Sequence, residues 1–110
     1  PAAGGHILPH TDTPSKIVTM TLAVIGENEW TPAVGGGIDI NRPRDPRLAY
    51  NQLNRQAGFE EMEVLETFEF LPNSGVIFIK TFNSWHSVRP MRSTDPELMR
   101  RNLIINIKSI

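Results

Sequence analysis

The sequence predicts an all-β protein, mainly antiparallel, built as a sandwich or small barrel such as a jelly roll, with one short helical insertion. Two observations predict this class. About seven short segments combine β-branched and aromatic residues with alternating apolar and polar positions, as the strands of a half-buried sheet do. Turn-forming residues separate these segments, and no repeat or shift in composition divides the 110 residues into more than one domain.

The first long strand-like segment spans residues 16–25. Ahead of it, residues 1–5 are small and are expected to be poorly ordered unless another segment pairs with them. Alternate positions of residues 16–25 give one apolar and one semi-polar face, as a strand beside a polar cavity would, although an edge strand would look similar. The semi-polar face carries Ile17, Thr19, Thr21 and Ala23, and the apolar face carries Val18, Met20, Leu22 and Val24.

A glycine run and a helix-like segment follow. Gly35-Gly36-Gly37 permits a bulge or a close backbone approach, but no Lys-Ser/Thr pair follows to make a phosphate-binding loop. Asp45 as N-cap, Pro46 in the first turn and Gly58 as the stop predict a short helix over residues 45–58. This helix is expected as an insertion between strands, carrying Leu48, Tyr50, Leu53 and Ala57.

The second half of the chain returns to strand-like alternation. Residues 61–70 place apolar and acidic side chains on opposite faces, and the acidic face is typical of a solvated sheet surface rather than a cation site. Residues 71–75 have the composition of a turn. Residues 76–79, 82–88 and 100–107 then predict two short strands and a final strand.

Composition excludes several classes of protein. The net charge is −1 and the eight arginines and three lysines are scattered, so no basic stripe predicts binding to nucleic acid. The absence of cysteine excludes disulfides, thiolate metal sites and cysteine nucleophiles. No signal peptide and no apolar run of about 20 residues is visible, so we expect a cytoplasmic protein without a membrane span.

Three residues predict a metal site. His10 and Asp12 stand two positions apart, and residues at i and i+2 of an extended chain project from the same face. A third ligand has to come from elsewhere, and the two other histidines are His6 and His86. Two histidines and one carboxylate on one side of a metal form the facial triad of non-haem iron(II) oxygenases. Alone, His86 beside Trp85 would more often be a core histidine. The less favoured alternative for His10 and Asp12 is a surface histidine and a turn cap.

These residues, with a final arginine segment, resemble the 2-oxoglutarate and iron(II)-dependent oxygenases, specifically the prolyl-4-hydroxylase-like group. His10-Thr11-Asp12 resembles the proximal His-x-Asp motif, and His86-Ser87-Val88 resembles the distal histidine segment. Arg100-Arg101-Asn102-Leu103 resembles the start of the last core strand, whose arginine usually binds the cosubstrate's distal carboxylate. The likeness runs from Gly5 to about Ile107, nearly the whole chain.

The resemblance implies a double-stranded β-helix core over residues 1–110 that lacks the N-terminal elements of the family. It implies an enzyme, a dioxygenase that uses Fe(II), 2-oxoglutarate and O₂ to hydroxylate a C–H bond of an unidentified peptide or small-molecule substrate, with release of succinate and CO₂. His10, Asp12 and His86 would hold the metal. Because a core without its first strand leaves a sheet edge unpaired, we also expect a homodimer or a marginally stable monomer.

The alternation of side chains along a strand indicates which residues bind the cosubstrate. Arg100, Asn102, Ile104 and Asn106 would share the more polar face of the last strand, so we choose Arg100 over Arg101 as the carboxylate anchor, with Asn102 as a helper. Thr21, or Thr19 beside it, would add a hydrogen bond from the semi-polar face of residues 16–25.

Two other functions compete with the oxygenase. One is a catalytically inactive jelly-roll module that binds a partner, and the short N-terminal region motivates it. The other is a cupin-like metal dioxygenase that does not use 2-oxoglutarate, against which the presence of Arg100 and the lack of further histidines near the motif argue. Succinate release on addition of Fe(II) and 2-oxoglutarate would distinguish the oxygenase from both of these alternatives.

Overall fold

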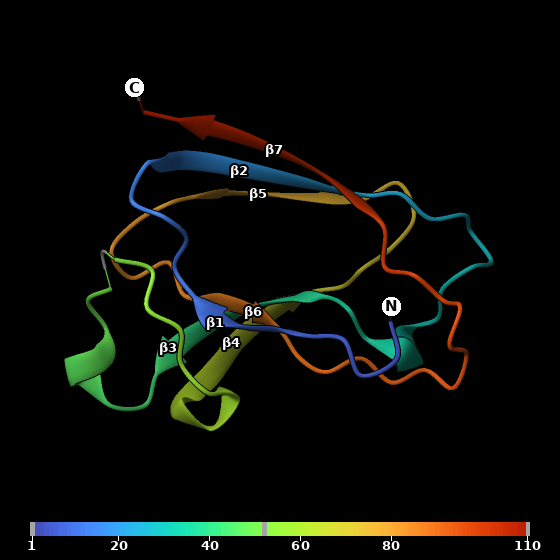
Figure 1. Cartoon of the computed structure of the whole chain (residues 1–110), viewed down its shortest axis with the longest axis horizontal. Helices are drawn as coiled ribbons and strands as arrows, with labels where there is room; N and C mark the ends of the chain where they lie inside the picture. Colours follow the sequence, from blue (N-terminus) through green and yellow to red (C-terminus); the bar gives the residue numbers. More distant parts are fainter. Residues whose placement is uncertain (1, 52, 110) are drawn as a thin grey trace.

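The computed structural model describes residues 2–51 and 53–109, and within them antiparallel strands form two sheets that pack together (Figure 1). The four-stranded sheet has the order β1-β6-β3-β4, from strands Ile7–His10, His86–Val88, Ile38–Pro43 and Met62–Phe68. The three-stranded sheet has the order β5-β2-β7, from strands Gly75–Ile79, Lys16–Ala23 and Asn102–Lys108. The predicted all-β, antiparallel class is therefore confirmed, in the form of a β-sandwich.

The predicted helix over residues 45–58 is wrong. Only a single 3₁₀ turn, η2 (Pro46–Leu48), forms there, and the rest of the segment is irregular; residue 52 lies outside the described residues. Asp45 does cap this turn, since its carboxylate accepts a hydrogen bond from the Arg47 backbone N–H at 3.0 Å. The segment continues as a loop because the Asn51 side chain takes the hydrogen bonds of the Arg55 backbone that a helix would otherwise use. Asn51 Oδ1 accepts from Arg55 N at 2.8 Å, and Asn51 Nδ2 donates to Arg55 O at 2.7 Å.

Two further 3₁₀ turns, η1 (Pro32–Val34) and η3 (Phe59–Glu61), complete the helical content of the described residues. None of the helices there has the length and apolar character needed to cross a membrane.

The three-stranded sheet has the alternation that the sequence predicts. β2 pairs with β5 on one side and β7 on the other, with Met20 opposite both Ile77 and Ile105. Because directly opposite residues project to the same face, this register gathers the apolar positions of three strands on the outer side of the sheet. Thr19 and Thr21 then point inward, toward the four-stranded sheet.

Apart from the separately buried Ile38, Met62, Trp85 and Val88, the buried apolar residues of the described chain form one small cluster. Trp30, Phe70 and Met91 form it together with Ala2, which has no exposed surface. The N-terminal segment is held there by backbone hydrogen bonds from Ala2 N to Leu98 O and from Gly4 N to Met91 O. The pairing on which the order of residues 1–5 was expected to depend is therefore present for residues 2–5, because Met91 and Leu98 form backbone hydrogen bonds with them.

Candidate metal centre

His10 and His86 meet across neighbouring strands of the four-stranded sheet. β1 and β6 run antiparallel, and their register places His10 directly opposite His86. Their ring centroids lie 4.4 Å apart. Strand pairing thus joins two histidines that are 76 positions apart in the chain, the difference between 86 and 10.

Asp12 reaches the two histidines by a turn and not by an extended strand. β1 ends at His10, and Asp12 has a φ of 73°, in the left-handed region that aspartate tolerates better than most residues. This turn folds the carboxylate back over His10. The i, i+2 spacing in the sequence was informative, but the same-face geometry assumed for it is wrong.

The three side chains can hold one metal ion. His10 Nε2 lies 3.0 Å from Asp12 Oδ1, and His86 Nε2 lies 3.5 Å from Asp12 Oδ2. One ligand atom from each residue lies within 4.8 Å of the others. Neighbouring ligands at bonds of about 2.1 Å to a shared metal stand roughly 3 Å apart, so this donor set fits a first-row divalent ion with little movement.

The orientation of each imidazole is set by a backbone carbonyl. His10 Nδ1 donates to Leu8 O, and His86 Nδ1 donates to Ser84 O, each at 2.8 Å. These bonds leave Nε2 of both rings facing the carboxylate, which is how metal-binding histidines are normally oriented. The Phe78 ring packs against His86 with centroids 4.5 Å apart and holds that ring from the opposite sheet.

Asp12 is buried and ionised. Burial by itself raises the pKa of this carboxyl, but hydrogen bonds from His10 and His86 and the positive charge of Lys16 outweigh burial and hold the pKa far below its usual range. Lys16 Nζ lies 3.6 Å from Asp12 Oδ1. The carboxylate is therefore in the form that a metal ligand requires.

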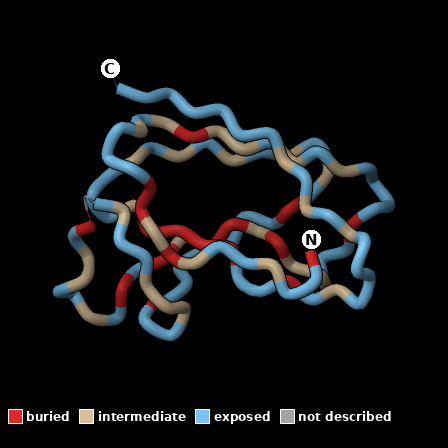
Figure 2. The backbone as a smooth tube through the Cα atoms, in the orientation of Figure 1, coloured by how far each residue is buried: buried red, intermediate tan, exposed pale blue. Residues whose placement is uncertain are grey.

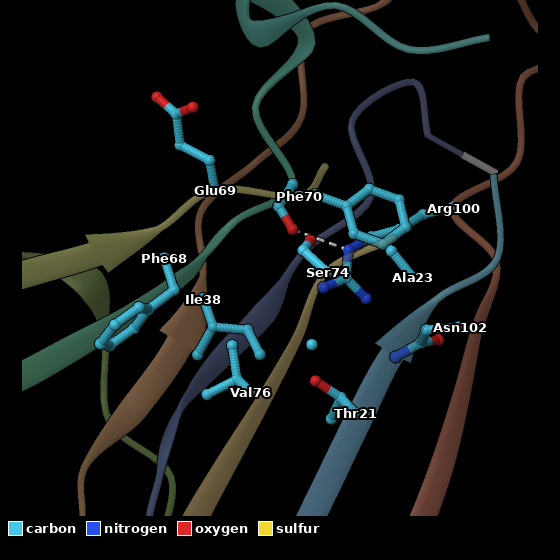
Figure 3. A pocket seen from close by; sticks show the side chains of 12 residues that line it. Thr21, Ala23, Ile38, Phe68, Glu69, Phe70, Ser74, Val76, Arg100 and Asn102 are labelled. Carbon is cyan, nitrogen blue, oxygen red and sulfur yellow. Dashed lines mark hydrogen bonds between the residues drawn. The ribbon is translucent and has the colours of Figure 1, made fainter. Parts of the chain in front are cut away.

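The predicted cosubstrate residues line the same cavity as the triad. This cavity, of ≈ 150 Å³, lies between the two sheets, and its walls include Thr21, Arg100 and Asn102 as well as His10, Asp12 and His86. An adjoining narrower pocket shares Thr21, Ile38, Arg100 and Asn102 (Figure 3). Figure 3 shows Thr21 and Asn102 on neighbouring strands, on the side of that pocket where the Arg100 guanidinium lies.

Arg100 is held at the end of this pocket without a carboxylate partner. Its Nε donates to Gly36 O at 2.8 Å, and its guanidinium lies 4.6 Å from the centre of the Phe70 ring. Burial lowers the pKa of Arg100, and no ion pair with it occurs among the described residues. A half-buried cation without a counter-charge is costly, which is the situation that an anionic ligand relieves.

The glycine run positions Arg100. Gly36 has a φ of 82°, and a Cβ there would lie 2.8 Å from the Trp30 ring and 3.5 Å from Arg100 Nε. A side chain at Gly36 would collide with the Trp30 ring and strain the backbone, so glycine is favoured where the carbonyl accepts from Arg100 Nε. The predicted close backbone approach at this run occurs at Gly37, where a Cβ would lie 2.7 Å from Phe68 O.

The other residues considered, apart from Thr19, lie away from the cavity. Arg101 is exposed and pairs with Glu29 Oε2 at 2.8 Å, so it points to the opposite side of the chain from Arg100. Trp85 is buried and donates from Nε1 to Ala49 O at 3.1 Å. His6 is exposed and packs edge-on against Phe59, outside the triad. Thr19 lines the cavity, but its hydroxyl donates to Asn106 Oδ1 at 3.0 Å.

Sequence reasoning missed Lys16, Phe78 and Phe70. Phe78 could have been found by strand parity, since it alternates with Ile77 and Ile79 on a short strand. Lys16 stands four residues after Asp12, a spacing that carries no signal in a non-helical segment. Phe70 lies beyond the end of β4, where alternation no longer predicts direction.

Comparison of the chain with known proteins finds no matching family model, no matching curated protein and no matching solved structure. The functional inference therefore depends on the geometry of this site.

Proposed function

We propose that the chain is an Fe(II)- and 2-oxoglutarate-dependent dioxygenase with a double-stranded β-helix core. One observation carries the proposal: a single cavity between the sheets is lined by a His-Asp-His group suited to a divalent metal and by an arginine with no carboxylate partner among the described residues. Metal chemistry and recognition of a carboxylate are the two requirements of this reaction, and the cavity offers a residue set for each.

The triad supplies the metal ligands. His10, Asp12 and His86 would hold Fe(II) through two imidazole nitrogens and one carboxylate, which leaves other coordination positions for exchangeable ligands. Bound iron would supply the site at which dioxygen is reduced while the 2-oxo acid loses CO₂. The balanced reaction converts the substrate C–H bond, O₂ and 2-oxoglutarate into C–OH, succinate and CO₂.

The rest of the cavity would bind and orient the cosubstrate. Arg100 presents a planar guanidinium that matches the distal carboxylate of 2-oxoglutarate, and its terminal nitrogens make no hydrogen bond to any described residue. Asn102 and Thr21 add hydrogen-bonding groups beside it. A cavity of ≈ 150 Å³ suits a small acid, being below the roughly 300–1,000 Å³ that drug-sized ligands occupy.

The test measures binding and turnover separately. Fe(II) and 2-oxoglutarate are added under anaerobic conditions and the metal-to-ligand absorption band is followed, and succinate is then measured after oxygen is admitted. The proposal requires both a stoichiometric complex and succinate formation. Metal binding without 2-oxoglutarate binding would instead indicate a dioxygenase that uses no 2-oxo acid, and absence of both would indicate a binding module.

A further inference from the structure

All three lysines of the chain lie at the end of the three-stranded sheet where the metal triad sits. Lys16 begins β2, Lys80 directly follows β5 and Lys108 ends β7. Lys80 Nζ donates to Thr11 Oγ1 at 3.2 Å, so it contacts the segment that connects His10 to Asp12. Residues 16, 80 and 108 are far apart in the sequence, and the antiparallel order β5-β2-β7 brings them to one end.

Two of these lysines form a like-charge pair across the sheet. Lys16 and Lys108 are direct partners in the register of β2 and β7, so their side chains project to the same face. Directly opposite like charges destabilise a sheet. Among the described residues the only carboxylate within ion-pair distance of any lysine is Asp12, which lies beside Lys16. The local charge is therefore in excess and positive.

Metal binding would increase this excess. Asp12 is the carboxylate ligand of the triad, so its negative charge would be shared with a dication and would no longer neutralise Lys16 alone. Lys16 lines the cavity and Lys108 is exposed next to it. Because a cavity of ≈ 150 Å³ suits one small acid, a substrate would bind beside it, and Lys16 carries a positive charge on the wall of that cavity.

We propose that Lys16 and Lys108 form an anion-binding subsite that recognises a carboxylate or phosphate group of the substrate to be hydroxylated. The substrate class is thereby narrowed to an anionic small molecule, bound beside the triad and distinct from the cosubstrate anchored by Arg100. This inference rests on the proposed function for the identity of the ligand as substrate, but the anion subsite itself is tested without turnover.

The test uses the three lysines as reporters. Lysine labelled with ¹³C gives three sets of Cε signals, which single Lys→Met variants assign. Propionate, methyl phosphate and the neutral control propionamide are added stepwise to protein loaded with 2-oxoglutarate and Zn²⁺, a diamagnetic substitute for Fe²⁺. We expect the Lys16 and Lys108 signals to shift together with one dissociation constant for an anion, and neither to respond saturably to propionamide.

Variants locate the subsite. Lys108→Met is expected to weaken anion binding at least about tenfold, as expected for loss of one charged hydrogen bond, and Lys16→Met by a similar factor. Arg92→Met removes an exposed positive charge from the loop before β7 and serves as the matched control, with unchanged anion binding. The probe that binds more tightly, propionate or methyl phosphate, identifies whether the substrate group is a carboxylate or a phosphate.

Three outcomes would overturn the inference: equal responses to propionate and propionamide, no saturable shift at either lysine, or displacement of propionate by 2-oxoglutarate, which would make the lysines part of the cosubstrate site. Failure of the proposed function has a different signature. If 2-oxoglutarate does not bind but both lysines still bind the anion in metal-free protein, the subsite stands and the dioxygenase assignment fails.

Discussion

A sheet in a β-sandwich usually has an apolar inner face and a polar outer face. The three-stranded sheet of this protein departs from that arrangement on both faces. The inner face carries the polar Thr19, Thr21, Asn102 and Asn106, together with the apolar Phe78 and Ile104, around a cavity. The outer face is apolar and open, with exposed fractions of 38–65 % for Leu22, Ile77, Ile79, Leu103, Ile105 and Ile107. Figure 2 shows buried residues gathered mainly in the four-stranded sheet, while the three-stranded sheet is largely exposed.

This inversion reflects two different requirements. A partly polar inner face costs burial energy but offers the hydrogen-bonding groups and charges that the proposed small acid and metal would need. The outer face presents on the order of 600 Å² of apolar surface, at the upper end of what a typical monomer exposes. Two copies stacked on these faces would bury on the order of 1,200 Å², the lower limit for a stable specific interface. We therefore expect a homodimer formed through this face rather than through a strand edge.

The largest expected effect is on metal affinity, when one ligand of the triad on the inner side is removed. We expect His86→Ala to reduce Fe(II) affinity by more than the roughly 10–100-fold that loss of an outer-shell partner costs, because a direct ligand is removed. Calorimetric metal titration measures this, and circular dichroism checks that the fold remains. His6→Ala is the matched control, since His6 is an exposed histidine outside the triad. Unchanged affinity in His86→Ala would refute the triad.

The next largest effect is on 2-oxoglutarate affinity and concerns Arg100, at the other end of the cavity. Arg100→Ala is expected to weaken 2-oxoglutarate binding by about 10–100-fold, since hydrogen bonds to charged groups contribute roughly 1.5–3 kcal/mol. Arg100→Lys keeps the charge without the planar fork and should fall between. Arg101→Ala, which removes only an exposed ion pair with Glu29, should leave binding unchanged. Titration of the three variants with 2-oxoglutarate under anaerobic conditions decides this, and equal losses for Arg100→Ala and Arg101→Ala would contradict the assignment.

A smaller effect is expected on self-association of the chain, when the outer face of the three-stranded sheet is changed. Ile77→Lys places a charge on the apolar face, opposite Met20 of the central strand β2, and should raise the dimer dissociation constant by at least about tenfold. Leu53→Lys is the matched control, because Leu53 is 79 % exposed and lies outside this sheet. Analytical ultracentrifugation over a range of concentrations measures both. A monomer at all concentrations, or association only with an added partner protein, would exclude a second copy as the occupant of this face.

The smallest effect concerns one hydroxyl on the inner face. Thr21→Val keeps the shape of the side chain and removes its hydrogen-bonding group, so 2-oxoglutarate affinity should fall by about two- to tenfold, equivalent to roughly 0.5–1.5 kcal/mol. Val18→Thr, on the outer face of the same strand, is the control and should not change affinity. If the two variants behave alike, the two faces of β2 do not differ in function.

The strands were predictable because alternation is a property of the local chain. β2 has two distinguishable faces in its sequence, and these faces occur in the sheet. The helix over residues 45–58 was mispredicted because its capping signals were real but local, whereas Asn51 binds the backbone at Arg55 and favours a loop. Strand ends were also misplaced: the predicted strand at 82–88 forms only at His86–Val88.

The sequence by itself determined the types of ligand available, two imidazoles and a carboxylate, and the parity that separates Arg100 from Arg101. Only the tertiary structure decided that His86 lies opposite His10, that Asp12 turns back at a positive φ, and that Arg100 is half-buried against Phe70. The tertiary structure also placed Lys16 opposite Lys108, which the sequence did not predict. The physical reason is that side-chain direction along a strand follows from the backbone repeat, whereas register and turns depend on which distant segments pack together.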